Sequence, residues 1–137
     1  MHIEHIEIIK PRISDINYGD HVGHVELIHL LHEVRVRFLH QYSLKETDVY
    51  GHVLMMRDLS VTYKSQVFWS NELRIKMRTK LSGAKIIFDY NVFNNTSGKE
   101  AALAEAIMVL LNREKGNLVK PDIFIRTIKN DSDKGKN

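Results

Sequence analysis

The stretch VELIHLLHEVRVRFLHQY, residues 25–42, decides the fold of this chain. Its apolar positions recur at spacings of three and four: Leu27, Leu30, Leu31, Val34 and Phe38. This is the pattern of an amphipathic helix, and polar residues at the same spacings form the opposite face. Ile28 and Leu39 widen the apolar side, so the helix is expected to pack deeply. A helix of this kind needs a sheet wrapped around it.

The segments around the helix have the patterns of strands. Residues 58–64, 72–81 and 86–92 alternate apolar and polar side chains, which predicts three strands after the helix. Ser82-Gly83 and residues 94–98 are turn signals between them. Residues 3–16 are predicted to form a strand before the helix, in which Pro11 marks an edge or an interruption.

Residues 100–112, EAALAEAIMVLLN, fit two structures. Their alanine content favours a helix. Their apolar second half is also typical of a strand buried on both faces, and the segment follows a hairpin turn. We predict a strand, so the expected order is one strand, one long helix and four strands.

Composition limits the classes of function. A chain of 137 residues forms one domain, predicted over residues 1–124 and followed by a flexible tail over 125–137. The formal charge of +3 is spread among acidic residues, whereas nucleic-acid binding favours a concentrated basic patch. No apolar run reaches the ~20 residues of a membrane span, and the N-terminus lacks a signal-peptide pattern, so a soluble cytoplasmic protein is expected. The chain has no cysteine, which excludes thiolate metal sites and a cysteine nucleophile.

The loop before the helix, residues 14–24, holds the densest group of reactive side chains. The first amides of a helix lack partners and carry partial positive charge, so they can polarise a carbonyl oxygen. Asp15 lies nine residues before His24 and could reach this terminus. A carboxylate there can attack an acyl carbon or take a proton from an attacking water. The loop therefore predicts a hydrolytic site without serine or cysteine.

Residues 12–39 resemble the active-site region of hotdog-fold acyl-CoA thioesterases of the 4-hydroxybenzoyl-CoA thioesterase type. Asp15 matches the leading aspartate of that family's loop, His21-Val22 match its His-Val pair, and His24 takes a position held by Asn or His. The helix signature is matched by Glu33, Arg35, Phe38 and Leu39. Residues 58–63, which end in Tyr63, resemble the family's second strand.

The resemblance implies an α+β hotdog fold, a five-stranded antiparallel sheet wrapped around one long central helix. It implies hydrolysis of an acyl-CoA thioester, with Asp15 as nucleophile or general base and His24 orienting water or substrate. Amides near Gly23, His24 and Val25 would form the oxyanion site, and His21 and Tyr63 would contact substrate. A homodimer or homotetramer with sites at the dimer interface is implied, and no metal or cofactor is required.

The sequence departs from the family pattern, which leaves alternatives open. Asn17 replaces the second acid, the glycine comes early at Gly19, and Gly23 stands where Asn is usual. Asp15, Asn17 and His21 also resemble the Asp-x-Asn-Pro-x-His motif of hotdog enoyl-CoA hydratases, although the proline is absent and the histidine is displaced by one residue. A non-catalytic acyl-CoA binding module is a further alternative. Each candidate also has a structural interpretation: Asp15 as a turn residue, Glu33 as the i,i+4 partner of Arg37.

Overall fold

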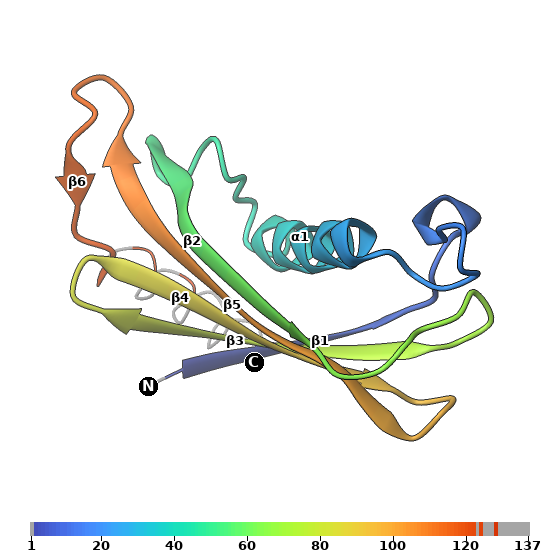
Figure 1. Ribbon diagram of the computed structural model, residues 1–137. Helices are drawn as coiled ribbons and strands as arrows, with labels where there is room; N and C mark the ends of the chain where they lie inside the picture. The colour runs from blue at the N-terminus through green and yellow to red at the C-terminus, as the bar shows by residue number, and fades with distance from the viewer. Residues whose placement is uncertain (1, 123, 125–127, 129–137) are drawn as a thin grey trace.

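The computed structural model describes residues 2–122, 124 and 128. Its elements follow in the order β1 (His2–Ile9), a 3-10 turn η1 (Ile13–Asp15), α1 (His24–His40), β2 (His52–Tyr63), β3 (Leu73–Ser82), β4 (Lys85–Asn94), β5 (Lys99–Asn112) and β6 (Leu118–Val119). The strands form one antiparallel sheet in the order β1-β3-β4-β5-β2, and the short β6 pairs with β5. The sheet curves around α1 (Figure 1), which confirms the predicted hotdog architecture.

The helix forms where the apolar spacing predicts it, and its apolar stripe is buried. Buried positions are Leu27, Leu30, Leu31, Val34, Arg35, Phe38 and Leu39. The helix begins at His24, one residue before the predicted start, with Gly23 as its N-cap and Gln41 as its C-cap. The stripe packs against the inner faces of β3, β4 and β5, which contribute side chains such as Ile75, Phe88 and Met108 to the same core.

Residues 100–112 are a strand, as predicted. β5 pairs with β4 on one side and with β2 on the other, so it lies inside the sheet. Ala102, Ala106 and Leu110 are fully buried there. Pairing to two neighbours supplies every backbone group with a partner, and this outweighs the helix propensity of the alanines.

The N-terminal prediction was too long. β1 is an edge strand that ends at Ile9, two residues before Pro11, and residues 13–15 form a 3-10 turn instead of continuing the strand. The backbone N–H of Arg12 donates to the Asp15 carboxylate over 2.7 Å, and this bond closes the turn. A strand would have held these two groups apart, so local side-chain to backbone bonding overrides the alternation of the sequence.

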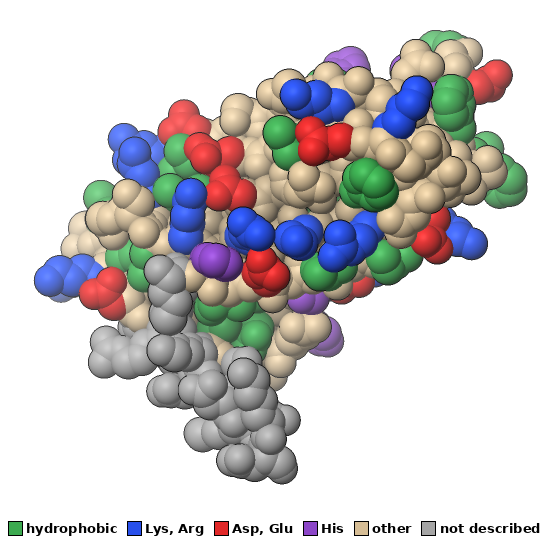
Figure 2. All heavy atoms as spheres, turned by 90° about the horizontal axis from the view of Figure 1, so that it is seen from below, with side chains coloured by type: hydrophobic (Ala, Val, Ile, Leu, Met, Phe, Trp, Pro, Cys, Tyr) green, Lys and Arg blue, Asp and Glu red, His purple; other side chains and the backbone are tan. Residues whose placement is uncertain are grey.

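The convex face of the sheet carries a row of cations that the sequence analysis had described as spread out. Arg74, Lys76, Arg78 and Lys80 occupy alternate positions of β3, and Figure 2 shows a row of Lys and Arg side chains on this face. Arg78 pairs with Glu4 at 3.0 Å and Lys80 with Asp89 at 3.1 Å. Such exposed pairs contribute at most about 1 kcal/mol each.

Two described residues beyond β6 belong to the core. Phe124 and Ile128 are both fully buried. Ile128 belongs to the predicted tail of residues 125–137, and the rest of that tail lies outside the described residues. Within the described part of the chain, no helix is both long and apolar enough to cross a membrane.

Candidate active site

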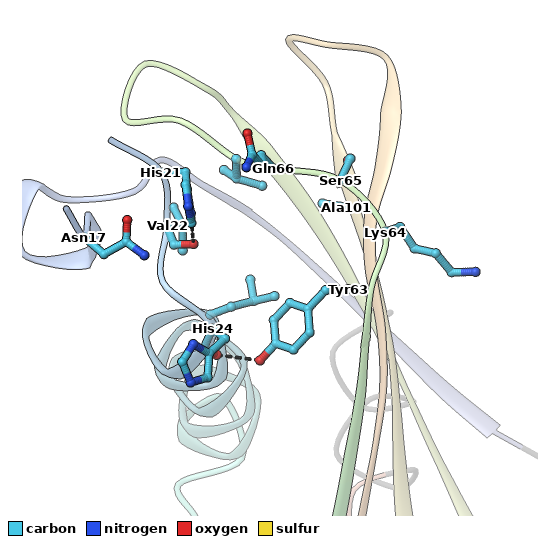
Figure 3. A pocket seen from close by; sticks show the side chains of 11 residues that line it. Asn17, His21, Val22, His24, Tyr63, Lys64, Ser65, Gln66 and Ala101 are labelled. Atoms are coloured by element: carbon cyan, nitrogen blue, oxygen red, sulfur yellow. Dashed lines mark hydrogen bonds between the residues drawn. The ribbon is translucent and has the colours of Figure 1, made fainter. Parts of the chain in front are cut away.

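A cavity of about 360 Å³ opens between the first turn of α1, the end of β2 and the segment that follows β2. Its polar lining comes from Asn17, His21, His24, Tyr63, Lys64, Ser65 and Gln66, and its apolar lining from Val22, Leu27, Val67 and Ala101. Figure 3 shows Asn17 and His21 on the loop before the helix, His24 at the start of the helix, and Tyr63 facing it from β2. The cavity therefore lies between the loop that was predicted to hold the site and the end of β2, although these segments are almost forty residues apart in the sequence.

The loop that carries Asn17 and His21 is held by short-range bonds. The amide N–H of Asn17 donates to the His21 carbonyl at 2.9 Å, and its side-chain oxygen accepts the Gly19 N–H at 2.9 Å. A Cβ atom on Gly19 would lie 2.9 Å from the imidazole of His21. The early glycine of this sequence therefore makes room for His21.

The start of the helix presents free backbone donors beside this cavity. The Gly23 N–H donates to the Asp15 carbonyl at 3.2 Å, and the Leu27 N–H makes the first intrahelical bond, to the Gly23 carbonyl at 3.0 Å. The amides of His24, Val25 and Glu26 lie between them, at positions without an intrahelical acceptor. The Gly23 amide is thus engaged, and Gly23 caps the helix. The oxyanion role of the amides near Gly23, His24 and Val25 stays a prediction.

Gly23 leaves space that the Glu26 carboxylate occupies. A Cβ atom at this position would overlap that carboxylate, which folds back over the helix terminus, so a larger residue here would require the flexible Glu26 side chain to move. A carboxylate in the first turn is stabilised by the helix dipole.

Tyr63 ties the edge strand to the helix start. Its hydroxyl donates to the His24 carbonyl at 2.6 Å, and the two rings meet edge to face with centroids 6.5 Å apart. Burial, and next the negative charge of Glu26, raise the pKa of Tyr63 above its ordinary value of 10.0. The phenol therefore stays protonated and remains a donor over the whole physiological range.

Asp15 lies beside the helix start, where its carbonyl accepts the Gly23 N–H, but it does not line the cavity. The side chain is 2% exposed, accepts the Arg12 N–H at 2.7 Å and lies 3.5 Å from the Arg12 guanidinium. Of the predicted site residues, His21, His24 and Tyr63 line the cavity, whereas Asp15, Gly23 and Val25 do not. The Asp15 carboxylate instead closes its own turn.

The sequence analysis missed part of the cavity wall. Ser65 and Gln66 follow the end of β2 and carry no motif. Their position just after Tyr63 was the only signal in the sequence. Which residues face each other across the cavity is set by the order of the strands, and local sequence does not give that order.

Glu33 pairs with Arg37 at 3.2 Å, which confirms its interpretation as a helix salt bridge.

Two tyrosines are expected to titrate late. Burial raises the pKa of Tyr90 above 10.0, although the nearby Arg35 guanidinium acts in the opposite direction. Tyr63 is shifted the same way. A phenol with a raised folded-state pKa favours folding below pH 10, and this contribution is lost as the pH rises through the folded-state value. Absorbance titration of the five tyrosines should show a late component that shrinks in Tyr63→Phe and in Tyr90→Phe; unchanged late titration in both would contradict this assignment.

Comparison with known proteins identifies the family. Residues 11–127 match the model of the Thioesterase-like superfamily. The chain belongs to that superfamily. The match covers the loop, the helix and strands β2 to β6, so the cavity lies inside the matched region. No curated protein matches the chain by sequence.

Solved structures of thioesterases share the superfamily fold at low sequence identity. The 1,4-dihydroxy-2-naphthoyl-CoA thioesterase of Synechocystis is 15% identical, with a TM-score of 0.81 over 91% of this chain and 95% of that one. The DHNA-CoA thioesterase of Staphylococcus aureus is 17% identical, with a TM-score of 0.77 over 97% and 91%. A mutant 4-hydroxybenzoyl-CoA thioesterase complexed with 4-hydroxybenzoyl-CoA is 14% identical, with a TM-score of 0.76 over 91% and 98%. These likenesses establish the fold.

Proposed function

We propose that this protein hydrolyses an acyl-CoA thioester to a carboxylic acid and coenzyme A. The observation that carries the proposal is the cavity in which free helix amides, the His24 imidazole and the Tyr63 edge strand meet. Membership of the thioesterase-like superfamily supports it. So does the structure of a fold relative in complex with its own CoA thioester.

The helix amides supply the electrostatic part of the reaction. The thioester carbonyl oxygen would accept hydrogen bonds from first-turn amides such as those of His24 and Val25. When water adds to the carbonyl carbon, negative charge develops on this oxygen, and the helix terminus stabilises it. The C–S bond then breaks, the carbonyl re-forms, and coenzyme A leaves as the thiol after taking up the proton that the water lost.

Two side chains are candidates for the group that takes the proton from water. The position of His24 favours it as the proton acceptor. Its exposed imidazole lines the cavity beside the N-terminus of α1, where the thioester carbonyl would bind. Asp15 stays a predicted base, and to act it would have to release the Arg12 amide. Asp15→Asn separates its possible roles, since the amide oxygen can still accept the Arg12 N–H but the side chain no longer accepts a proton. A loss of ~10² in kcat would support Asp15 as the base, and retained activity would assign it to the turn.

Thiol release tests the proposed reaction against its alternatives. Acyl-CoAs of short, medium and long chain and of aromatic type are mixed with the protein and a thiol reagent. Because the protein has no cysteine, its own background is zero. Catalytic thiol release supports the hydrolase. Hydration of an α,β-unsaturated acyl-CoA without thiol release supports the hydratase, and saturable binding without turnover supports the binding module.

The free edge of β2 supports assembly with a second copy of the chain. β2 ends the sheet, and apolar side chains including Met55, Met56 and Leu59 remain 37–45% exposed along it. Unpaired strand edges readily pair with another strand. We propose a homodimer in which two β2 edges meet, close to the cavity because Tyr63 belongs to this strand. A tetramer of such dimers and the cytoplasmic location stay predictions.

Met55→Lys is expected to weaken this dimer, because a charge on an edge strand opposes strand pairing. Light scattering with size-exclusion chromatography should show twice the chain mass for the wild type and a shift toward the single-chain mass for the variant. Leu118→Lys, on β6, serves as the control because Leu118 is similarly exposed at 54% and belongs to a different strand. A monomeric wild type would contradict the proposed assembly.

A further inference from the structure

A second, smaller hollow lies in the groove between α1 and β2. Its volume is about 110 Å³. The helix contributes Ile28 and Leu31 to its walls, and the strand contributes Met56 and Leu59. These four side chains are apolar, and the lining is completed by His29, His32, Arg35 and Tyr90. The apolar walls suit a hydrocarbon group.

The hollow and the larger cavity are both lined by residues of α1 and β2. Tyr63 meets His24 at the cavity, and Leu59, four residues back along β2, lines the hollow together with Ile28, four residues on along α1. At 1.5 Å per residue, Ile28 and Leu31 lie roughly 6–10 Å beyond His24 along the helix axis. A group attached to a carbonyl at the helix terminus can therefore extend along the groove into the hollow.

A fixed polar group closes the far end of the hollow. Arg35 donates to the Tyr90 hydroxyl at 3.0 Å and lies 3.4 Å from the Glu46 carboxylate. Arg35 is 5% exposed and Tyr90 3%, and the guanidinium also lies 6.0 Å from the centre of the Phe88 ring. A hydrocarbon chain that extended further would have to separate this buried ion pair, which is strongly unfavourable.

We propose that this slot, bounded by Ile28, Leu31, Met56, Leu59 and the Arg35–Tyr90 floor, binds the acyl tail of the substrate and limits it to short and medium linear aliphatic chains. The inference rests on the proposed function. At roughly 30 Å³ per water-sized group, the slot holds about four carbon atoms. A cavity that accommodates a benzene ring has about 150 Å³, so the slot favours a linear chain over an aromatic one.

The test is the ratio of kcat/KM for a medium-chain to that for a long-chain acyl-CoA, in the wild type and in two variants. The wild type should prefer C6 to C8 over C12 to C16 and over benzoyl-CoA. Leu59→Ala, which deepens the slot, should shift the ratio toward the longer chains by about tenfold, and Leu59→Phe should shift it toward C4 by a similar factor. A ratio between two substrates is insensitive to a general loss of folded enzyme. Because Leu59 also lies on the proposed dimer edge, light scattering must show the wild-type mass for both Leu59 variants.

Leu103→Ala is the matched control. Leu103 and Leu59 are both leucines with 39% exposure, but Leu103 lies on the opposite face of the sheet, beside Arg74 and Lys76. The ratio of kcat/KM for medium-chain to long-chain acyl-CoA in Leu103→Ala should equal that of the wild type. Hydrolysis that peaks at long or aromatic substrates, or a ratio that Leu59 substitutions leave unchanged, would overturn the slot and leave the thioesterase intact.

Absence of hydrolysis would instead overturn the proposed function. The slot is then judged by binding of non-hydrolysable thioether analogues of the same chain lengths. Tightest binding at C6 to C8, shifted by Leu59→Ala, supports the slot, and affinity independent of chain length overturns it.

Discussion

Arg35→Ala is expected to lower the free energy of unfolding by about 3 kcal/mol. The substitution removes a buried cation, and the Tyr90 hydroxyl and the Glu46 carboxylate lose this partner. The Arg35 side chain is 7% exposed, and it joins Tyr90 on β4 to Glu46 in the segment after the helix. Glu46 is 22% exposed, which places the expected loss at the lower end for a broken buried pair. Urea denaturation measures the change.

Arg37→Ala is the control for this loss. Arg37 lies two residues further along the same helix, is 46% exposed and pairs with Glu33 and Glu7. Exposed pairs contribute little, so the expected loss is below about 1 kcal/mol. Equal losses in the two variants would contradict the view that Arg35 holds the interior together.

His24→Ala is expected to lower kcat for acyl-CoA hydrolysis by about 10²-fold, which is the lower range for removal of a general acid–base group. The fold should tolerate the change, because Tyr63 bonds to the backbone carbonyl of residue 24 and not to the imidazole. Steady-state thiol release gives kcat, and the urea midpoint reports the folded state.

His40→Ala controls for the loss of an exposed helix histidine. His40 is at the other end of α1, far along the chain from the cavity residues, and its removal should leave kcat unchanged. Full activity in His24→Ala, combined with a loss of activity in Asp15→Asn, would move the proton-accepting role from His24 to Asp15.

The elements of the fold were predictable because their signals are local and repeated. The three-four spacing of Leu27, Leu31 and Phe38 required a buried helix, and the position of residues 100–112 after a hairpin turn outweighed their alanine content. The signal for the burial of Arg35 was also present. This residue lies four positions after Leu31 and three before Phe38, so the helix carries it into the apolar stripe.

The orientation of side chains in the candidate site was less predictable. The family resemblance pointed to a loop that lines the cavity, but the position of the Asp15 carboxylate depends on its bond to the Arg12 amide. Ser65 and Gln66 reach the cavity only because β2 pairs with β5 and ends beside the helix. These features depend on rotamers and strand order, which local sequence does not determine.

The most direct test of the proposed hydrolysis is the reaction of hexanoyl-CoA in water enriched in ¹⁸O, with free thiol and labelled hexanoic acid measured together. We expect many turnovers per protein chain, with one thiol released for each acid formed. Each acid molecule should carry one oxygen atom from the solvent. Binding of hexanoyl-CoA without release of thiol, for this substrate and for the rest of the acyl-CoA panel, would contradict the proposed hydrolysis.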